Sequence, residues 1–142
     1  MPPVLFDTST YISALRRGDQ AVLALRRVAP DAPVWLSVVV LQELYAGAGD
    51  RDRHLIEGLE IDFEVGNRIL IPILDDWIAA GRVLARLAAK YDYDQIGRGR
   101  LTNDALIAMS AGRRGVTVIT SNKKEFSRLA EFRNFNWQIT TF

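Results

Sequence analysis

The feature of the sequence that most constrains the fold is the alternation of short apolar runs with longer segments of helical periodicity. Runs such as 4–6, 34–36 and 116–119 are rich in Val, Ile, Leu and aromatic residues and have the length of buried strands. Strands that alternate with helices form βαβ units, which build a parallel sheet covered by helices on both faces. We therefore predict an α/β fold, a three-layer α/β/α sandwich around a central parallel sheet.

The boundaries of the predicted elements follow from capping and breaking residues. The predicted strands are 4–6, 34–36, 69–74, 116–119 and, as an edge strand, 137–141. The predicted helices are 10–17, 21–28, 38–48, 51–63, 77–91, 105–113 and 123–132. Ser37, Asp75, Thr102 and Asn122 are predicted helix N-caps, and 92–100 a polar loop. The length of 142 residues predicts one domain, 1–142.

Composition removes several classes of site. The chain has no cysteine and a single histidine, His54, which excludes thiol catalysis, Cys-ligated metals and zinc sites with several His ligands. The first residues have no basic run and soon reach an aspartate, which is unlike a secretory signal. No apolar run reaches the ~18 residues of a transmembrane helix. We therefore expect a cytoplasmic protein with no membrane contact.

Acidic residues gather where such a fold binds its ligands. In open parallel sheets the ligand crevice lies beyond the carboxyl ends of the strands. Asp7 directly follows the first predicted strand, and Glu43, Asp104 and Glu125 lie on helices that follow strands or on faces rich in apolar residues. Taken alone, each acid has an ordinary explanation. Asp7 can cap a helix or form an Asx-turn, and the carboxylate of Glu43 can point into solvent. Asp104 and Glu125 can be favoured by the helix dipole at the start of a helix.

Taken together, the four acids favour a metal site. Clustered carboxylates repel one another, so a fold keeps them together mainly when a cation binds. Oxygen ligands without Cys or His select Mg²⁺, with Mn²⁺ as an alternative. Such sites are typical of phosphoryl-transfer chemistry, in which the metal activates a water and neutralises charge on the phosphate. No histidine base is then required.

Four segments of the chain, in order, resemble the motifs of one family. They are Val-Leu-Phe-Asp-Thr-Ser-Thr-Tyr-Ile (4–12), Leu-Ser-Val-Val-Val-Leu-Gln-Glu-Leu-Tyr-Ala-Gly-Ala (36–48), Asn-Asp-Ala-Leu-Ile-Ala-Met-Ser-Ala (103–111) and Val-Ile-Thr-Ser-Asn-Lys-Lys-Glu-Phe (118–126). Residues 4 to about 132 resemble a PIN-domain ribonuclease, specifically the toxin of a VapBC-type toxin–antitoxin pair. The resemblance implies a PIN-like α/β/α sandwich and a Mg²⁺-dependent endoribonuclease that cleaves RNA phosphodiester bonds.

The resemblance also implies roles for individual residues. Asp7, Glu43 and Asp104 correspond to the first three catalytic and metal-binding acids. Many members carry an aspartate where Asn122 stands, and Glu125 resembles the alternative fourth acid of some toxins, so either residue is a candidate fourth ligand. The candidate substrate contacts are Thr8, Thr120, Asn122, Arg98 and Arg100; the two arginines could equally belong to a solvated loop. Arginine makes up 15 of the 18 basic residues, and its planar fork suits phosphate.

The resemblance to this family also implies binding partners for the protein. Its members commonly form homodimers, and a cognate antitoxin inhibits them by filling the acidic cleft. The net charge of +1 by itself says nothing about nucleic acid.

Two other classes of function stay open from the sequence. Asp7-Thr8-Ser9-Thr10 after a strand could be a phosphoacceptor or phosphatase site, although one phosphatase family would need a second aspartate where Ser9 stands. The chain could also be a catalytically silent PIN-like binding module, which the retention of three acids disfavours.

Overall fold

Five parallel strands form the centre of the molecule. The computed structural model describes residues 2–18, 32–92 and 95–140, and for 95–100 it describes the backbone alone. The strands are β1 (Val4–Phe6), β2 (Val34–Ser37), β3 (Ile69–Leu70), β4 (Thr117–Thr120) and β5 (Trp137–Ile139). They lie in the order β3-β2-β1-β4-β5, and all four pairings are parallel. The predicted parallel sheet, with its late edge strand, is confirmed.

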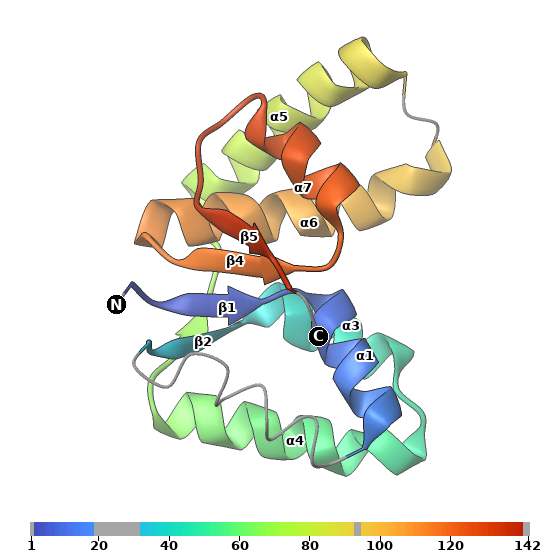
Figure 1. Cartoon of the computed structure of the whole chain (residues 1–142), viewed down its shortest axis with the longest axis vertical. Coiled ribbons are helices and arrows are strands. Elements are labelled where there is room, and N and C mark those ends of the chain that lie inside the picture. Colours follow the sequence, from blue (N-terminus) through green and yellow to red (C-terminus); the bar gives the residue numbers. More distant parts are fainter. Residues whose placement is uncertain (1, 19–31, 93–94, 141–142) are drawn as a thin grey trace.

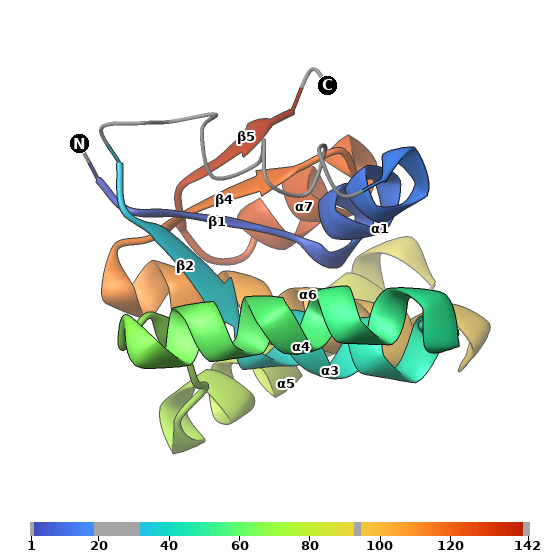
Figure 2. The same ribbon diagram turned by 90° about the horizontal axis from the view of Figure 1, so that it is seen from below.

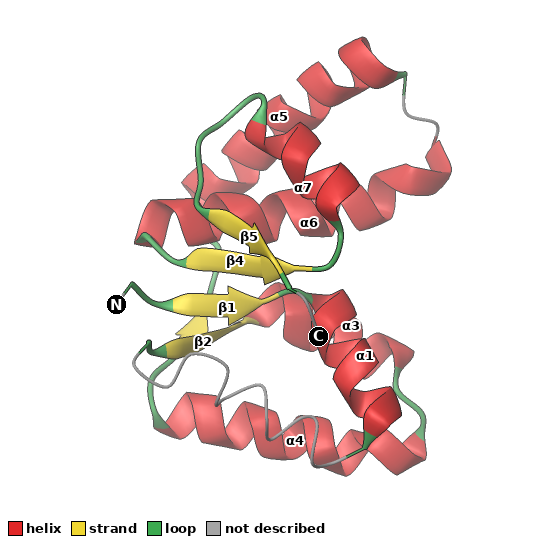
Figure 3. Ribbon diagram, viewed as in Figure 1, coloured by secondary structure: helices red, strands yellow, loops and turns green. Residues whose placement is uncertain are grey.

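Helices cover both faces of this sheet, as the predicted sandwich requires. They are α1 (Thr8–Arg17), α3 (Val38–Gly47), α4 (Asp50–Val65), α5 (Leu74–Tyr91), α6 (Gln95–Arg114) and α7 (Lys123–Ala130). In Figures 1 and 2, α1 and α7 lie on one side of the strands, and α3, α5 and α6 on the other. Figure 3 shows the strand arrows pointing the same way, so that their carboxyl ends meet beside the first turns of α1 and α7.

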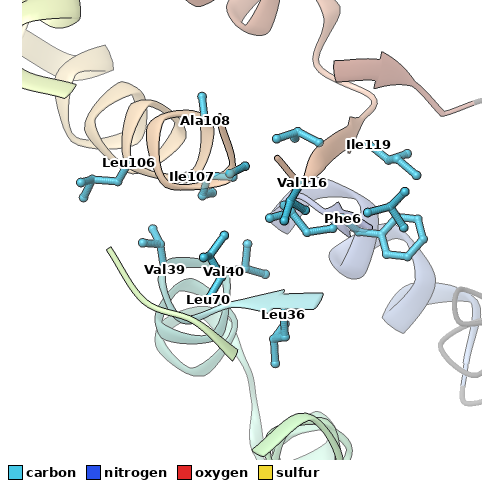
Figure 4. Close-up of a cluster of buried hydrophobic side chains, with 14 of the residues drawn as sticks. Phe6, Leu36, Val39, Val40, Leu70, Leu106, Ile107, Ala108, Val116 and Ile119 are labelled. Carbon is cyan, nitrogen blue, oxygen red and sulfur yellow. The ribbon is translucent and has the colours of Figure 1, made fainter. Parts of the chain in front are cut away.

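The core includes buried residues of α1 and α7 on one side of the sheet and of α3 and α6 on the other. Leu5, Leu36 and Val118 of the three central strands are completely buried. Figure 4 shows side chains of α6, including Ile107, gathered with those of α3, including Val40, beside the strands. Because α6 is anchored on this apolar side, its polar residues can be held at a fixed position over the sheet.

The start of α5 differs from the prediction. Strand β3 ends at Leu70, well before the predicted Leu74, because Pro72 has no N–H to continue a ladder. Helix α5 then begins at Leu74, and Asp75 is not its N-cap. The first-turn acid that satisfies the helix start is Asp76, whose Oδ2 accepts from the N–H of Ile73 at 2.9 Å.

The largest difference concerns residues 92–100, which were predicted as a loop. Helix α6 already begins at Gln95, and Thr102 therefore lies inside a helix and is no cap. Two glycines in this stretch disfavour a helix by only about 1 kcal/mol each. The packing of α6 along α5 outweighs that local preference. Asp104 is consequently the tenth residue of a 20-residue helix, too far from its start to be explained by the helix dipole.

Other predictions have simpler outcomes. Ser37 and Asn122 cap α3 and α7 as predicted. His54 is exposed on α4. The predicted helix 21–28 lies outside the described residues. None of the described helices combines the length and the apolar character that crossing a membrane would require.

Candidate metal centre

The site is built at the carboxyl ends of β1 and β4, which are neighbours in the sheet. Phe6 pairs with Ile119, and the N–H of the next residue, Asp7, donates to the carbonyl oxygen of Ile119 at 3.1 Å. Asp7 thus extends β1 by one residue and also caps α1, which begins at Thr8. On the neighbouring strand, β4 ends at Thr120, and Asn122 caps α7. Two loops of the sheet therefore bring their polar residues to one place.

Asp7 is buried, with 3% of its surface exposed, and both of its oxygens are occupied. Its Oδ1 accepts from the N–H of Thr10 at 3.1 Å and from the Thr10 hydroxyl at 2.8 Å. Its Oδ2 accepts from the Thr120 hydroxyl. The Ser9 hydroxyl contacts both oxygens, at 2.9 and 3.0 Å. Four hydrogen-bond donors around one buried carboxyl group restrict its rotation, so they hold the Asp7 side chain fixed in place.

Glu43 joins the site from α3. It is half-buried, and its Oε1 accepts from the hydroxyl of Thr8 at 2.6 Å. This bond links the first residue of α1 to the middle of α3, two helices that pack together. Glu43 is thereby held at the start of α1 rather than free in solvent. Beside it, between α1, α3 and α4, lies a hollow of about 230 Å³ whose wall includes Glu43.

Asp104 approaches the same place from α6, with 7% of its surface exposed. Burial is the largest cause that raises the pKa of Asp104 to about 9, followed by a carboxyl–carboxyl hydrogen bond with Glu125 and by the negative charges of Glu125, Asp7 and Glu43. Two carboxyl groups can be bonded in this way only when they share a proton. The structure therefore brings together all four acids that were singled out in the sequence. We call Asp7, Glu43, Asp104 and Glu125 the acid cluster.

Glu125 and Asn122 act as one unit on α7. The side-chain oxygen of Asn122 accepts from the N–H of Glu125, and its amide nitrogen donates to Glu125 Oε2 at 3.0 Å. The N–H of Asn122 in turn donates to the Thr120 hydroxyl at 2.9 Å. Asn122 therefore orients the carboxylate of Glu125 toward Asp104. Of the two candidates for a fourth ligand, Glu125 is the one that faces the other acids.

The donor set of the acid cluster fits an oxygen-preferring divalent cation. Asp104 Oδ2 is buried and has no hydrogen-bond partner among the described residues. An oxygen left in that state costs about 1–3 kcal/mol unless a positive group reaches it. As the side chains stand, no three acids within the described ranges are arranged tightly enough to hold an ion.

Two hydroxyls at the site were not singled out in the sequence. Ser9 and Ser121 follow the ends of β1 and β4, and their Oγ atoms lie 3.0 Å apart on the exposed side of Asp7. Both serines come shortly after strands that are neighbours in the sheet, and this position in the sequence could have identified them as site residues. By contrast, Arg98 and Arg100 lie on the first turns of α6, not in a loop, and their side chains are outside the described part of the chain.

The arrangement bears on the phosphoacceptor alternative. An aspartate that accepts a phosphoryl group needs one oxygen free to attack. Both oxygens of Asp7 are engaged by hydroxyl groups, and the side chain is almost completely buried. The site is instead suited to holding charge in a fixed position.

Comparison with known proteins places this geometry in context. Residues 4–132 match the PIN domain family. The fold is similar to a DNA-bound VapBC from Salmonella typhimurium (24% identity, 98% of each chain covered, TM-score 0.71). It is also similar to VapBC2 from Rickettsia felis bound to a promoter DNA fragment (22% identity, 96% of this chain and 98% of that chain, TM-score 0.67). A third similar structure is VapBC-1 from nontypeable Haemophilus influenzae (22% identity, 96% of each chain, TM-score 0.61). A search of curated proteins finds no match to this chain.

Proposed function

The chain belongs to the PIN domain family, and we propose that it is a Mg²⁺-dependent endoribonuclease that acts as the toxin of a VapBC-type pair. The observation that carries the proposal is the acid cluster: four carboxylates from four separate elements converge, one of them deeply buried and with an unpartnered oxygen. A fold bears the repulsion of such a cluster when a divalent cation is its ligand. The proposal treats residues 1–142 as one domain working in the cytoplasm.

Within this proposal, each member of the acid cluster has a distinct part. Asp7 and Asp104 would be the principal metal ligands, since they are the most buried acids of the group. Glu43 and Glu125 would complete the ligand set from the α3 and α7 sides. A bound Mg²⁺ or Mn²⁺ would supply Lewis-acid activation and neutralise charge on the scissile phosphate. The hydroxyls around Asp7 keep its carboxylate from turning, so that the group meets a phosphate in a fixed orientation.

Substrate contacts would come from the polar groups at the rim of the cluster. Thr8, Thr120 and Asn122 present hydroxyl and amide groups next to the acids, although each already bonds to a member of the cluster or its neighbour. Their part is therefore to position the acids as much as to contact RNA. Arg98 and Arg100, on the first turns of α6, would add positive charge for the phosphate backbone.

The direct test is cleavage of RNA by the purified protein. We expect cleavage with Mg²⁺ or Mn²⁺ and its complete loss in EDTA, restored by excess Mg²⁺, because the acid cluster offers oxygen ligands only. The products should be mapped by sequencing on total RNA. Undiminished cleavage in EDTA would contradict the metal mechanism. Phosphate incorporated at Asp7, with no RNA cleavage, would favour the phosphoacceptor alternative.

We further propose that a small antitoxin inhibits the protein by placing a basic side chain in the acid cluster. A guanidinium would take over the positive charge that the carboxylates require and pair with them in bidentate fashion. The double variant Asp7→Asn/Asp104→Asn should therefore bind the antitoxin roughly 10–100-fold more weakly, with a shallower dependence on salt. Binding measured by calorimetry at two salt concentrations checks this, and equal affinity of both proteins would mean that the antitoxin binds elsewhere. A homodimer is the assembly that we propose for the toxin itself.

A further inference from the structure

A cluster of aromatic and charged side chains lies where the end of α7 meets the end of α5, and the acid cluster makes no use of it. The guanidinium carbon of Arg128 lies 4.2 Å from the centre of the Tyr91 ring. The ammonium of Lys90 lies 5.1 Å from the same ring centre and 5.9 Å from that of Phe132. Glu131 accepts hydrogen bonds from Lys90 and from the Tyr91 hydroxyl. We call these five residues the α5–α7 cluster.

The α5–α7 cluster lies beside the acid cluster, about one helical turn away along α7. Arg128 follows Glu125 by three residues and Phe132 follows Arg128 by four, which is the spacing of residues on one side of a helix. Glu125 is the acid that α7 contributes to the acid cluster, where it bonds to Asp104. Figure 1 shows α7 running from the end of β4 toward α5. A molecule bound at the acid cluster therefore has to extend by only about 5–6 Å along α7 to reach Arg128.

The surface around the α5–α7 cluster is positively charged. Residues 86–92 and 123–133 contain six basic side chains and three acidic ones, and one of these acids is Glu125 of the acid cluster. The chain as a whole is nearly neutral, with a net charge of +1. Most of the basic side chains in these two segments are exposed: Arg86, Lys90, Lys123, Lys124 and Arg133. The acid cluster repels a polyanion, so a positive surface next to it is what a substrate with several phosphates requires.

The rings and the guanidinium of the α5–α7 cluster have the form of a stacking platform. Single-stranded RNA is bound largely by stacking of its unpaired bases on aromatic rings and on arginine planes. Tyr91, Arg128 and Phe132 are only half-buried, so their planar groups are in part accessible. Glu131 fixes the Tyr91 ring and the Lys90 ammonium at once, which reduces the entropy lost when a base stacks there. A purely structural contact between α5 and α7 is the alternative that experiments have to exclude.

We propose that the α5–α7 cluster binds the nucleotide next to the scissile phosphate of a single-stranded RNA, with its base stacked on the Tyr91–Arg128 pair and its phosphate near Lys90. This inference rests on the proposed nuclease function, since it names how that site holds its substrate. A base inside a duplex is already stacked on its neighbours, so the platform selects unpaired RNA. Because every base has a π face, the subsite selects strand form more than sequence. Glu131 is a positioning residue, which holds Tyr91 and Lys90 and does not itself touch the RNA.

Binding of RNA without cleavage tests the proposal. The probes are short single-stranded oligoadenylate and oligouridylate labelled with fluorescein, titrated with protein in EDTA and followed by fluorescence anisotropy. We expect Tyr91→Ala to raise the Kd roughly 5–100-fold, because the stacking of one base is lost. Tyr91→Phe keeps the ring and loses only the bond to Glu131, so its Kd should stay within about threefold of the wild type. The dependence of Kd on salt should stay the same in both variants, since neither change removes a positive charge.

Changes of charge give a result that a structural contact would not give. Arg128→Gln should weaken binding roughly tenfold and reduce the slope of log Kd against log salt by about 0.7. Arg128→Lys keeps the charge and loses the planar group, so it should also bind more weakly but with the slope of the wild type. Glu131→Gln still accepts hydrogen bonds and loses its negative charge, so it should bind RNA roughly threefold more tightly. If the cluster only joined two helices, Glu131→Gln would leave RNA binding unchanged.

Two controls separate the subsite from general effects of charge and folding. Arg51 is exposed on α4 and lies outside both clusters, so Arg51→Gln should change the Kd by less than about twofold. A duplex of the two oligonucleotides offers phosphates without unpaired bases, so Tyr91→Ala should leave the Kd for the duplex within about twofold of the wild type. Thermal melts show which variants fold. Should Tyr91→Ala fail to fold, Arg128→Lys and Glu131→Gln decide the question by the changes in Kd given above.

Four results would overturn the proposal: a wild type that does not bind the single-stranded probes, a folded Tyr91→Ala that binds them as tightly as the wild type, a Glu131→Gln that binds no more tightly, and an Arg51→Gln that weakens binding as much as Arg128→Gln. Cleavage in Mg²⁺ of an RNA that spans a mapped cleavage site separates the subsite from the proposed function. There Tyr91→Ala should raise KM with kcat nearly unchanged, since the lost contact holds the substrate before and during the reaction. RNA binding that depends on Tyr91, with no cleavage of any RNA, would count against the nuclease and leave the subsite standing. Cleavage with the same KM in Tyr91→Ala and the wild type would do the reverse.

Discussion

Replacing Asp104 by asparagine should make the metal-free protein more stable while it removes the activity. At pH 8 in EDTA we expect Asp104→Asn to melt about 6–10 °C higher than the wild type, corresponding to a gain of roughly 2 kcal/mol for a domain of this size. The reason is that Asp104 is buried among three other carboxylates, and its Oδ2 has no hydrogen-bond partner among the described residues. An asparagine amide can donate to Glu125 with no shared proton.

The gain in stability of Asp104→Asn over the wild type should increase as the pH rises. The pKa of Asp104 is raised from 3.8 to about 9 in the folded protein, so the folded state keeps a proton that the unfolded chain has lost. The contribution of Asp104 to the free energy of unfolding is therefore fully present below pH 4 and is lost as the pH rises toward 9. Asp104→Asn does not titrate at this position, so its stability does not fall in this way. The two melting temperatures should therefore be similar near pH 4 and furthest apart near pH 9.

With Mg²⁺ bound, the wild type should melt at a higher temperature than Asp104→Asn, the reverse of the order in EDTA. Binding to the folded state alone stabilises by mass action, and the wild type offers the complete ligand set. We expect Mg²⁺ to raise the melting temperature of the wild type and to have little effect on Asp104→Asn. A matched control is Asp76→Asn: Asp76 is equally buried, but it pairs with Arg113 at 3.0 Å. That variant should melt lower with and without Mg²⁺. An Asp104→Asn protein that melts no higher than the wild type in EDTA would contradict the cluster.

The parts of the site that the sequence predicts are those fixed by local chemistry. Asp7 and Asn122 follow directly on strands and cap the next helix, so their place at the carboxyl edge follows from a few neighbouring residues. The parallel direction of the strands follows from the alternation of strands and helices, whereas their order, β3-β2-β1-β4-β5, is known only from the structure. What the sequence could not provide is the environment of Asp104. That environment depends on α6 beginning at Gln95, and packing against α5 decides this over the local preference of two glycines.

The same limit applies to α5. Its periodicity predicts a helix, but apolar residues occur on both of its faces, so the sequence alone cannot tell which one faces the core. The structure assigns Val83 and Leu87 to the core and leaves Trp77 outside. Likewise, Asp75 and Asp76 are adjacent acids with equal capping propensity. Asp76 is the one that is buried, where it pairs with Arg113 of the neighbouring helix α6.

Replacing Asp7 should have the opposite effect on stability from replacing Asp104, although both changes should abolish cleavage. Asp7→Ala removes the N-cap of α1 and leaves the buried hydroxyls of Thr10 and Thr120 without their acceptor. A lost cap costs about 1 kcal/mol and each unsatisfied buried group roughly 1–3 kcal/mol. We expect Asp7→Ala to lose about 3–5 kcal/mol, a fall in melting temperature of more than about 10 °C.

Asp7→Asn separates the structural part of this residue from its part in the reaction. The amide oxygen can still accept from the N–H of Thr10, and the Thr120 hydroxyl can turn to accept from the amide nitrogen, so the loss should be about 1 kcal/mol. The negative charge is gone, however, and RNA cleavage should fall roughly 10²–10³-fold, as it would in Asp7→Ala.

A control variant changes one of the hydroxyl groups that bond to Asp7 and leaves the carboxylate itself in place. Thr10→Val removes one donor to Asp7 and keeps the side-chain shape, so it should lower stability by about 1 kcal/mol while cleavage stays within about tenfold of the wild type. Cleavage rates at saturating Mg²⁺, measured beside thermal melts, distinguish the two roles. If Asp7→Asn cleaves as fast as Thr10→Val does, the carboxylate of Asp7 serves only to cap α1. Its charge would then have no part in the reaction, and the metal would have to be held by the remaining acids of the cluster.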